Sequence, residues 1–64
     1  MQMTKKLYDV EDYITCEILK RNITEEEVYN FLKSQPPLKA FMVNDEVVFT
    51  SSNLTKQSIA FLFE

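Results

Sequence analysis

The segment Ile-Thr-Glu-Glu-Glu-Val, residues 23–28, decides the fold of the middle of this chain. Thr24 and Glu27 have the spacing of a capping box, in which each side chain accepts a hydrogen bond from the backbone N–H of the other residue. Ile23 and Val28 flank this pair as a hydrophobic staple. A helix is therefore predicted to begin after Thr24. The residues expected on its buried face are Val28, Phe31 and Leu32, with Tyr29 at the margin.

The double proline Pro36-Pro37 must end this helix, because proline lacks the backbone N–H that a helix interior needs. Beyond it, residues 39–43 and 46–50 are rich in β-branched and aromatic residues. They flank Asn44-Asp45, which is typical of a two-residue hairpin turn. The sequence therefore predicts a β-hairpin after the helix.

The register of this hairpin places Met42 opposite Val47 and Phe41 opposite Val48. Side chains alternate between the two faces of a strand, and here both faces carry apolar groups. We expect one face of the hairpin to pack on the helices and the other face to need a cover.

A first helix is predicted upstream, with Asp9 as its N-cap and Arg21-Asn22-Ile23 as a tight link to the next helix. Its apolar stripe would consist of Val10, Tyr13, Ile14, Ile18 and Leu19. Residues 54–63 are predicted to form a short helix on the hairpin, with a third strand as the alternative. The expected fold is a single α+β domain over residues 1–64, with two N-terminal helices, a β-hairpin and a short C-terminal helix or third strand.

The stretch from Glu17 to Leu32 resembles a helix-turn-helix, with Asn22 in the turn where glycine is usual. The hairpin that follows is similar to the wing of a winged-helix domain. This resemblance implies DNA binding through the second helix. However, that helix opens with Glu25, Glu26 and Glu27, which would face phosphates with like charge. DNA is therefore the less favoured partner.

Composition argues against several other functions. The 64 residues carry ten Asp and Glu, seven Lys and Arg, no His, no Gly and one Cys. With a net charge of −3, no general field attracts phosphate backbones. Without His or Gly, the chain has no base for a cysteine nucleophile and no Gly-rich phosphate loop. We expect no enzyme activity, no cofactor and no metal site.

The cellular location is expected to be the cytoplasm. Residues 1–6 lack the apolar core of a signal peptide, and no apolar run reaches the roughly 20 residues that span a bilayer. Cys16, the single cysteine, fits a reducing compartment and is expected to be buried. Membrane association is not expected.

The candidate binding residues are acidic or aromatic. Glu25, Glu26 and Glu27 with Asp45 and Glu46 would form an acidic surface for a basic partner. The aromatic residues exceed what so small a core encloses, so some are expected at an interface. The predicted aromatic and apolar anchors, for another protein or for a homodimer seam, are Tyr29, Phe61, Leu62 and Phe63.

The sequence therefore favours a small regulatory or adaptor protein that binds another protein stoichiometrically, for instance as an inhibitor of bacterial or phage origin. The alternative is a winged-helix-like transcription regulator that binds DNA as a dimer. Dimerisation would gather its few basic groups, Lys5, Lys6, Lys20, Arg21 and Lys33.

Overall fold

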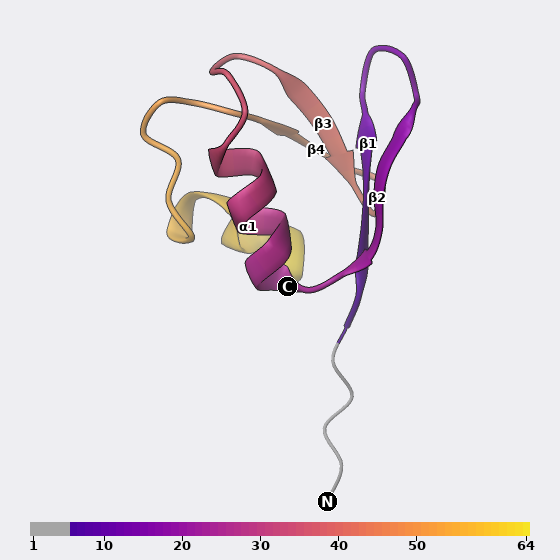
Figure 1. Ribbon diagram of the computed structural model, residues 1–64. Coiled ribbons are helices and arrows are strands. Elements are labelled where there is room, and N and C mark those ends of the chain that lie inside the picture. The colour runs from indigo at the N-terminus through magenta and orange to yellow at the C-terminus, as the bar shows by residue number, and fades with distance from the viewer. Residues whose placement is uncertain (1–5) are drawn as a thin grey trace, which may run out of the picture.

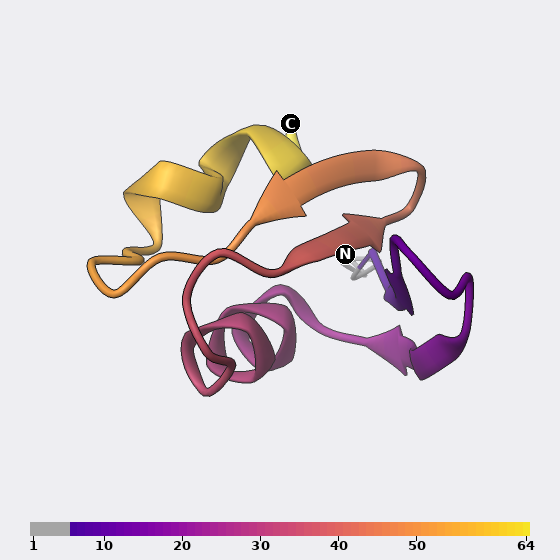
Figure 2. The same ribbon diagram turned by 90° about the horizontal axis from the view of Figure 1, so that it is seen from above.

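The computed structural model describes residues 6–64 as an antiparallel sheet with an α-helix and a 3₁₀-helix on the same side (Figure 1, Figure 2). The sheet has four strands in the order β2-β1-β3-β4. Residues 1–5, which include Lys5, lie outside the described part. The elements in chain order are β1 (Tyr8–Asp12), β2 (Ile18–Ile23), α1 (Glu25–Lys33), β3 (Ala40–Val43), β4 (Glu46–Phe49) and η1 (Gln57–Phe63).

The predicted fold class is wrong, because the chain does not form two N-terminal helices. The first predicted helix is replaced by the hairpin of β1 and β2. The fold is still α+β, but its sheet has four strands and its only α-helix among residues 6–64 is α1.

Strand pairing explains why the first helix does not form. Tyr8 and Val10 alternate with Asp9 and Glu11, which is the period of a strand, and both apolar side chains are buried. Val10 also pairs with Val43, so β1 lies between β2 and β3 in the middle of the sheet. The segment also has the periodicity of a helix, but as a central strand it gains backbone pairing on both sides and buries its apolar residues. The strand is therefore the more stable state.

The turn between β1 and β2 is built on Asp12. Its carboxylate accepts the backbone N–H groups of Ile14 at 2.8 Å and Thr15 at 3.0 Å, and its carbonyl accepts that of Cys16 at 2.8 Å. The bonds from Thr15 and Ile14 lower the pKa of the Asp12 carboxyl. Their contribution to stability is present above the ordinary carboxyl pKa and is lost as the pH falls through the lowered one.

The sole cysteine lies in this turn, where Cys16 adopts a φ of 63°. Its side chain is exposed, so the prediction that it is a buried apolar residue is wrong.

The second predicted helix is confirmed as α1. The Thr24 hydroxyl accepts the N–H of Glu27 at 3.3 Å, and the Glu27 carboxylate accepts that of Thr24 at 2.8 Å. Val28 and Leu32 are buried, and the helix ends at Lys33, before the prolines. Local capping chemistry therefore predicts this element correctly.

Thr24→Ala is expected to lower the free energy of unfolding by about 1 kcal/mol, because it removes the N-cap acceptor. Thr24→Ser keeps a hydroxyl at the same place and is the matched control. Urea denaturation followed by circular dichroism measures both. Equal stability of the alanine and serine variants would show that the capping box does not stabilise α1.

The predicted β-hairpin is also confirmed. Phe41 lies opposite Val48 and Met42 opposite Val47, as expected. The turn residues Asn44 and Asp45 have φ values of 45° and 74°. Asparagine and aspartate tolerate this left-handed conformation better than other residues with a side chain, which lets the turn form without glycine.

The C-terminal segment forms the predicted short helix, as a 3₁₀-helix, and not the alternative third strand. Ile59 and Leu62 of η1 are buried, together with Leu54 from the loop before it. The core thus lies between one face of the sheet and the two helices. Its members from the sheet and α1 are Tyr8, Val10, Phe41, Val43, Val48, Val28 and Leu32.

Candidate functional site

The sheet face opposite the helices carries two rows of cross-strand neighbours. One row joins Ile18, Glu11, Met42 and Val47 across all four strands. In the next row Ala40 pairs with Phe49. The N–H of Tyr13 donates to the Ala40 carbonyl at 3.2 Å, which extends this row by one residue. Because cross-strand partners share a face, these side chains belong to one surface.

This surface is apolar and largely open to solvent. The exposed fractions are 64% for Phe49, 47% for Tyr13, 43% for Ile18 and 37% for Val47. Met42 between them is half-buried. We call these five residues the open-face patch. The face of the β3–β4 hairpin that was expected to need a cover is therefore apolar, as predicted, and is left uncovered within the domain.

The outer face of a half-solvated antiparallel sheet normally carries polar residues, because its inner face alone packs on the core. Here Phe49 and Val47 occupy outer positions of β4 while Val48 faces the core. Glu11 is the charged residue within the first row. The residues beside the rows carry both signs of charge, with Glu17 before Ile18, Lys39 before Ala40 and Glu46 before Val47. The result is an apolar surface with one acidic residue, Glu11, within it.

The predicted acidic surface is partly used within the domain. Glu26 bonds Lys56 from the C-terminal segment, with 2.7 Å between Oε1 and Nζ, and this contact raises the pKa of Lys56. Glu27 belongs to the capping box, and the hydrogen bonds from Thr24 lower the pKa of its carboxyl. Glu25 has no such bond but lies close enough to Tyr8 to help raise the pKa of that phenol.

The tip of the β3–β4 hairpin is hydrogen-bonded to the start of β1. Asn44 Oδ1 accepts the N–H of Asp9 at 2.9 Å, and Asn44 Nδ2 donates to the Leu7 carbonyl at 3.4 Å. Asp45 and Glu46 are exposed beside it. Tyr8, which follows Leu7, pairs with Ile23 at the end of β2, and α1 begins two residues later. The hairpin tip and the first turn of α1 therefore lie at the same end of the sheet.

Only part of the predicted aromatic anchor is available for binding. Phe61 is 46% exposed, whereas Leu62 is 5% exposed and belongs to the core. Phe63 packs on Tyr8 edge to face, with ring centroids 5.0 Å apart. Phe61 is therefore the member of this group that a partner could reach.

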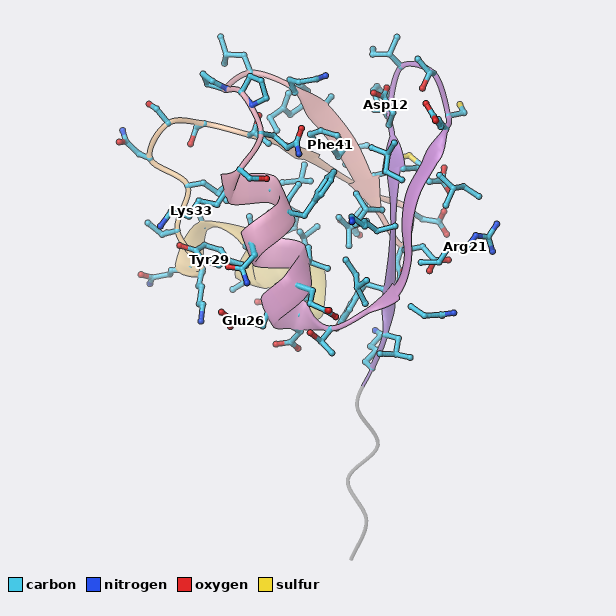
Figure 3. The ribbon with its side chains drawn as sticks, viewed as in Figure 1. Asp12, Arg21, Glu26, Tyr29, Lys33 and Phe41 are labelled. Carbon is cyan, nitrogen blue, oxygen red and sulfur yellow. The ribbon has the colours of Figure 1, made fainter. Side chains whose placement is uncertain are left out.

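Tyr29 of α1 lies at the margin of the core, between two lysines. Its ring centroid is 5.4 Å from Lys33 Nζ and 5.5 Å from Lys56 Nζ (Figure 3). Cation–π contacts of this kind hold an exposed aromatic ring against its own domain. Tyr29 is thus half-buried and less accessible than the open-face patch.

Tyr8 is the one buried side chain among residues 6–64 whose polar atom finds no hydrogen-bond partner. Burial, and secondarily Glu25, raises the pKa of its phenol. A buried hydroxyl without a partner costs about 1–3 kcal/mol of desolvation. Tyr8→Phe is therefore expected to raise the free energy of unfolding by about 1 kcal/mol. Thermal denaturation measures the change, and a lower melting temperature would show that the hydroxyl is hydrogen-bonded in solution.

A separate shallow groove lies between α1 and β2, with a volume of about 350 Å³. Its ionisable residues are Lys20 and Glu27, and Glu27 is already engaged by Thr24. Among residues 6–64 no cluster of three or more His, Cys, Asp or Glu side chains could hold a metal ion. The open-face patch therefore remains the most prominent candidate site.

Sequence reasoning missed Tyr13 and Ile18 as parts of a binding surface, because it placed them in the core stripe of a helix. The alternation from Tyr8 to Glu11 was the available signal for a strand. Arg21, which was grouped with the basic residues of a DNA-binding face, points away from α1 (Figure 3).

No helix in the described part of the chain is both long and apolar enough to span a bilayer. Comparison of this chain with protein-family models, with curated proteins and with solved structures finds no match. The resemblance to winged-helix domains accordingly stays a prediction.

Proposed function

We propose that this chain is a small regulatory protein that binds another protein stoichiometrically through its open-face patch. The observation that supports this function is the exposure of Tyr13, Ile18, Val47 and Phe49 on one side of a sheet whose other side carries the core. Contiguous exposed apolar surface on a small domain typically marks a binding site. Burying it would also compensate for the small core of a chain this short.

The residue types of the patch fit a protein partner. Tyr13 and Phe49 supply large, rigid aromatic groups, which are enriched in the cores of protein interfaces. Glu11 adds a negative charge within the rows, so the partner would present an apolar surface with a basic group opposite Glu11. A protein of this kind acts by occupying a surface of its target, as an inhibitor or adaptor does. Its site of action would be the cytoplasm.

Affinity capture with matched variants tests the proposal. Phe49→Lys places a charge in the patch, and Ser52→Lys places the same charge in the exposed loop after β4. The partner should be retained by the wild-type chain and by Ser52→Lys, and its affinity for Phe49→Lys should fall about 10-fold or more, as for an aromatic hot spot. Titration calorimetry of the captured protein would then give the stoichiometry. Equal affinity for all three chains would overturn the role of the patch.

The DNA-binding alternative has its own test. A gel shift across a salt series would show steep loss of affinity with salt if Lys20, Arg21 and Lys33 neutralise phosphates. A salt-dependent gel shift of this kind would support DNA binding and would contradict the proposed function. Absence of binding at low salt would remove the alternative.

A further inference from the structure

Strand β4 forms one edge of the sheet, and half of its backbone groups face outward. Its neighbour β3 pairs Val43 with Glu46 beside the two-residue turn, and the Thr50 N–H donates to Lys39 at 2.9 Å. Hydrogen-bonded and non-hydrogen-bonded pairs alternate along an antiparallel ladder. The N–H and C=O groups of Val47 and Phe49 therefore point away from β3. No backbone hydrogen bond outside the ladder uses them among the described residues.

The two edges of the sheet differ in how they are protected. At the other edge, β2 carries Lys20 and Arg21, and its pairing with β1 has two register shifts. Charges and bulges are the usual devices that keep an edge strand from pairing with another chain. In β4 the only charged residue is Glu46, at its start, and its pairing with β3 is regular. Beyond β4 there is no further strand in the sheet (Figure 2).

We propose that β4 pairs antiparallel with β4 of a second copy of this chain, about a two-fold axis at Val48. Val47 of each copy then lies opposite Phe49 of the other, and these two outward-facing pairs exchange four hydrogen bonds. The same pairs bring their exposed side chains together on one face. Glu46 lies opposite Thr50 of the second copy, so no like charges face each other.

Other positions of the two-fold axis would leave more of the outward-facing backbone groups of β4 without a partner in a strand. An axis at Val47 would set Asp45, which has a φ of 74° and is outside the strand, against Phe49 of the second copy. An axis at Phe49 would set Val47 against Ser51, which is also outside the strand. The axis at Val48 alone pairs both outward-facing residues of β4 within the strand. It gives a closed two-fold dimer with one continuous sheet.

The dimer is expected to be weak. A seam of this length buries much less than the roughly 800 Å² per partner of a standard interface, which suggests a Kd on the order of 0.1 mM. Pairing takes place in the plane of the sheet, so nothing covers the open face of either copy, although Val47 and Phe49 of the open-face patch lie at the seam. This inference is therefore independent of the proposed function, and its test needs only the purified chain.

Sedimentation equilibrium of the full chain between about 10 µM and 1 mM should show a monomer–dimer equilibrium. Over the same range, the backbone amide resonances of Val47 and Phe49 should shift most. Amide shifts concentrated at β2 would overturn the proposal, as would a monomer throughout. These wild-type measurements decide the question without any variant.

Val47→Pro adds a second test. It removes an outward N–H that β3 does not use, as proline on an edge strand can, and should weaken dimerisation at least 10-fold. Val47→Thr keeps the N–H and the β-branched shape, and should dimerise within a few-fold of the wild type. Circular dichroism confirms that both variants fold. Equal dimerisation of a folded Val47→Pro and Val47→Thr would contradict pairing through β4.

Discussion

Phe41→Ala is expected to lower the free energy of unfolding by about 3–5 kcal/mol, the usual cost of truncating a buried phenylalanine. Phe41 is 1% exposed and packs edge to face on Phe31, with ring centroids 5.4 Å apart. It thereby joins the middle of the sheet to α1. A domain of this size has a total stability of roughly 3–10 kcal/mol, so the variant should be largely unfolded at room temperature.

Phe49→Ala is the matched control, because it removes the same side chain from the neighbouring strand. Phe49 is 64% exposed on the open face and lies outside the core. Its truncation should change the free energy of unfolding by no more than about 0.5 kcal/mol. Urea denaturation followed by circular dichroism measures both variants. A tolerated Phe41→Ala, or an equally damaging Phe49→Ala, would show that the core lies elsewhere.

Thr50→Val is the second substitution with a large expected effect, because Thr50 is the only buried polar residue in the described part of the chain. Its hydroxyl donates to the Pro36 carbonyl at 2.6 Å and accepts the Lys39 N–H at 3.0 Å. Valine has nearly the same shape but leaves both backbone groups without their partner. The expected loss in the free energy of unfolding is about 1–3 kcal/mol.

Thr50→Ser separates this hydrogen bonding from packing. Serine keeps the hydroxyl and removes only a methyl group, so it should cost about 1 kcal/mol or less. Thermal denaturation of the two variants gives the comparison. If Thr50→Ser proved as destabilising as Thr50→Val, the methyl group would be what matters, and the hydroxyl would not hold the proline loop to the end of β4.

The sequence predicts the β4 half of the candidate site. Val47 and Phe49 alternate with Val48, and the Asn44-Asp45 turn sets their register, so an apolar outer face follows from local rules. Tyr13 and Ile18 could not be predicted in the same way. Their place on the open face depends on the pairing of β1 with both β2 and β3.

For the acidic residues, the sequence predicts where they lie in the secondary structure but not which of them are paired. Their positions at the start of a helix and at a hairpin tip were predicted correctly. That Glu26 would be bound by Lys56 was not predictable, since the two residues meet only when the C-terminal segment folds back beside α1. A charge count cannot distinguish a free carboxylate from one that is already paired.

By itself the sequence determined α1 and the β3–β4 hairpin, because a capping box and a two-residue turn act between residues a few positions apart. Only the tertiary structure decided the state of residues 8–23. Their apolar residues fit a helix stripe and a pair of strands alike. The choice depends on β3, which lies beyond α1 in the chain and supplies Val43 as the partner of Val10. Once β3 is available for pairing, a strand in this segment gains hydrogen bonds and burial that an isolated helix would lack.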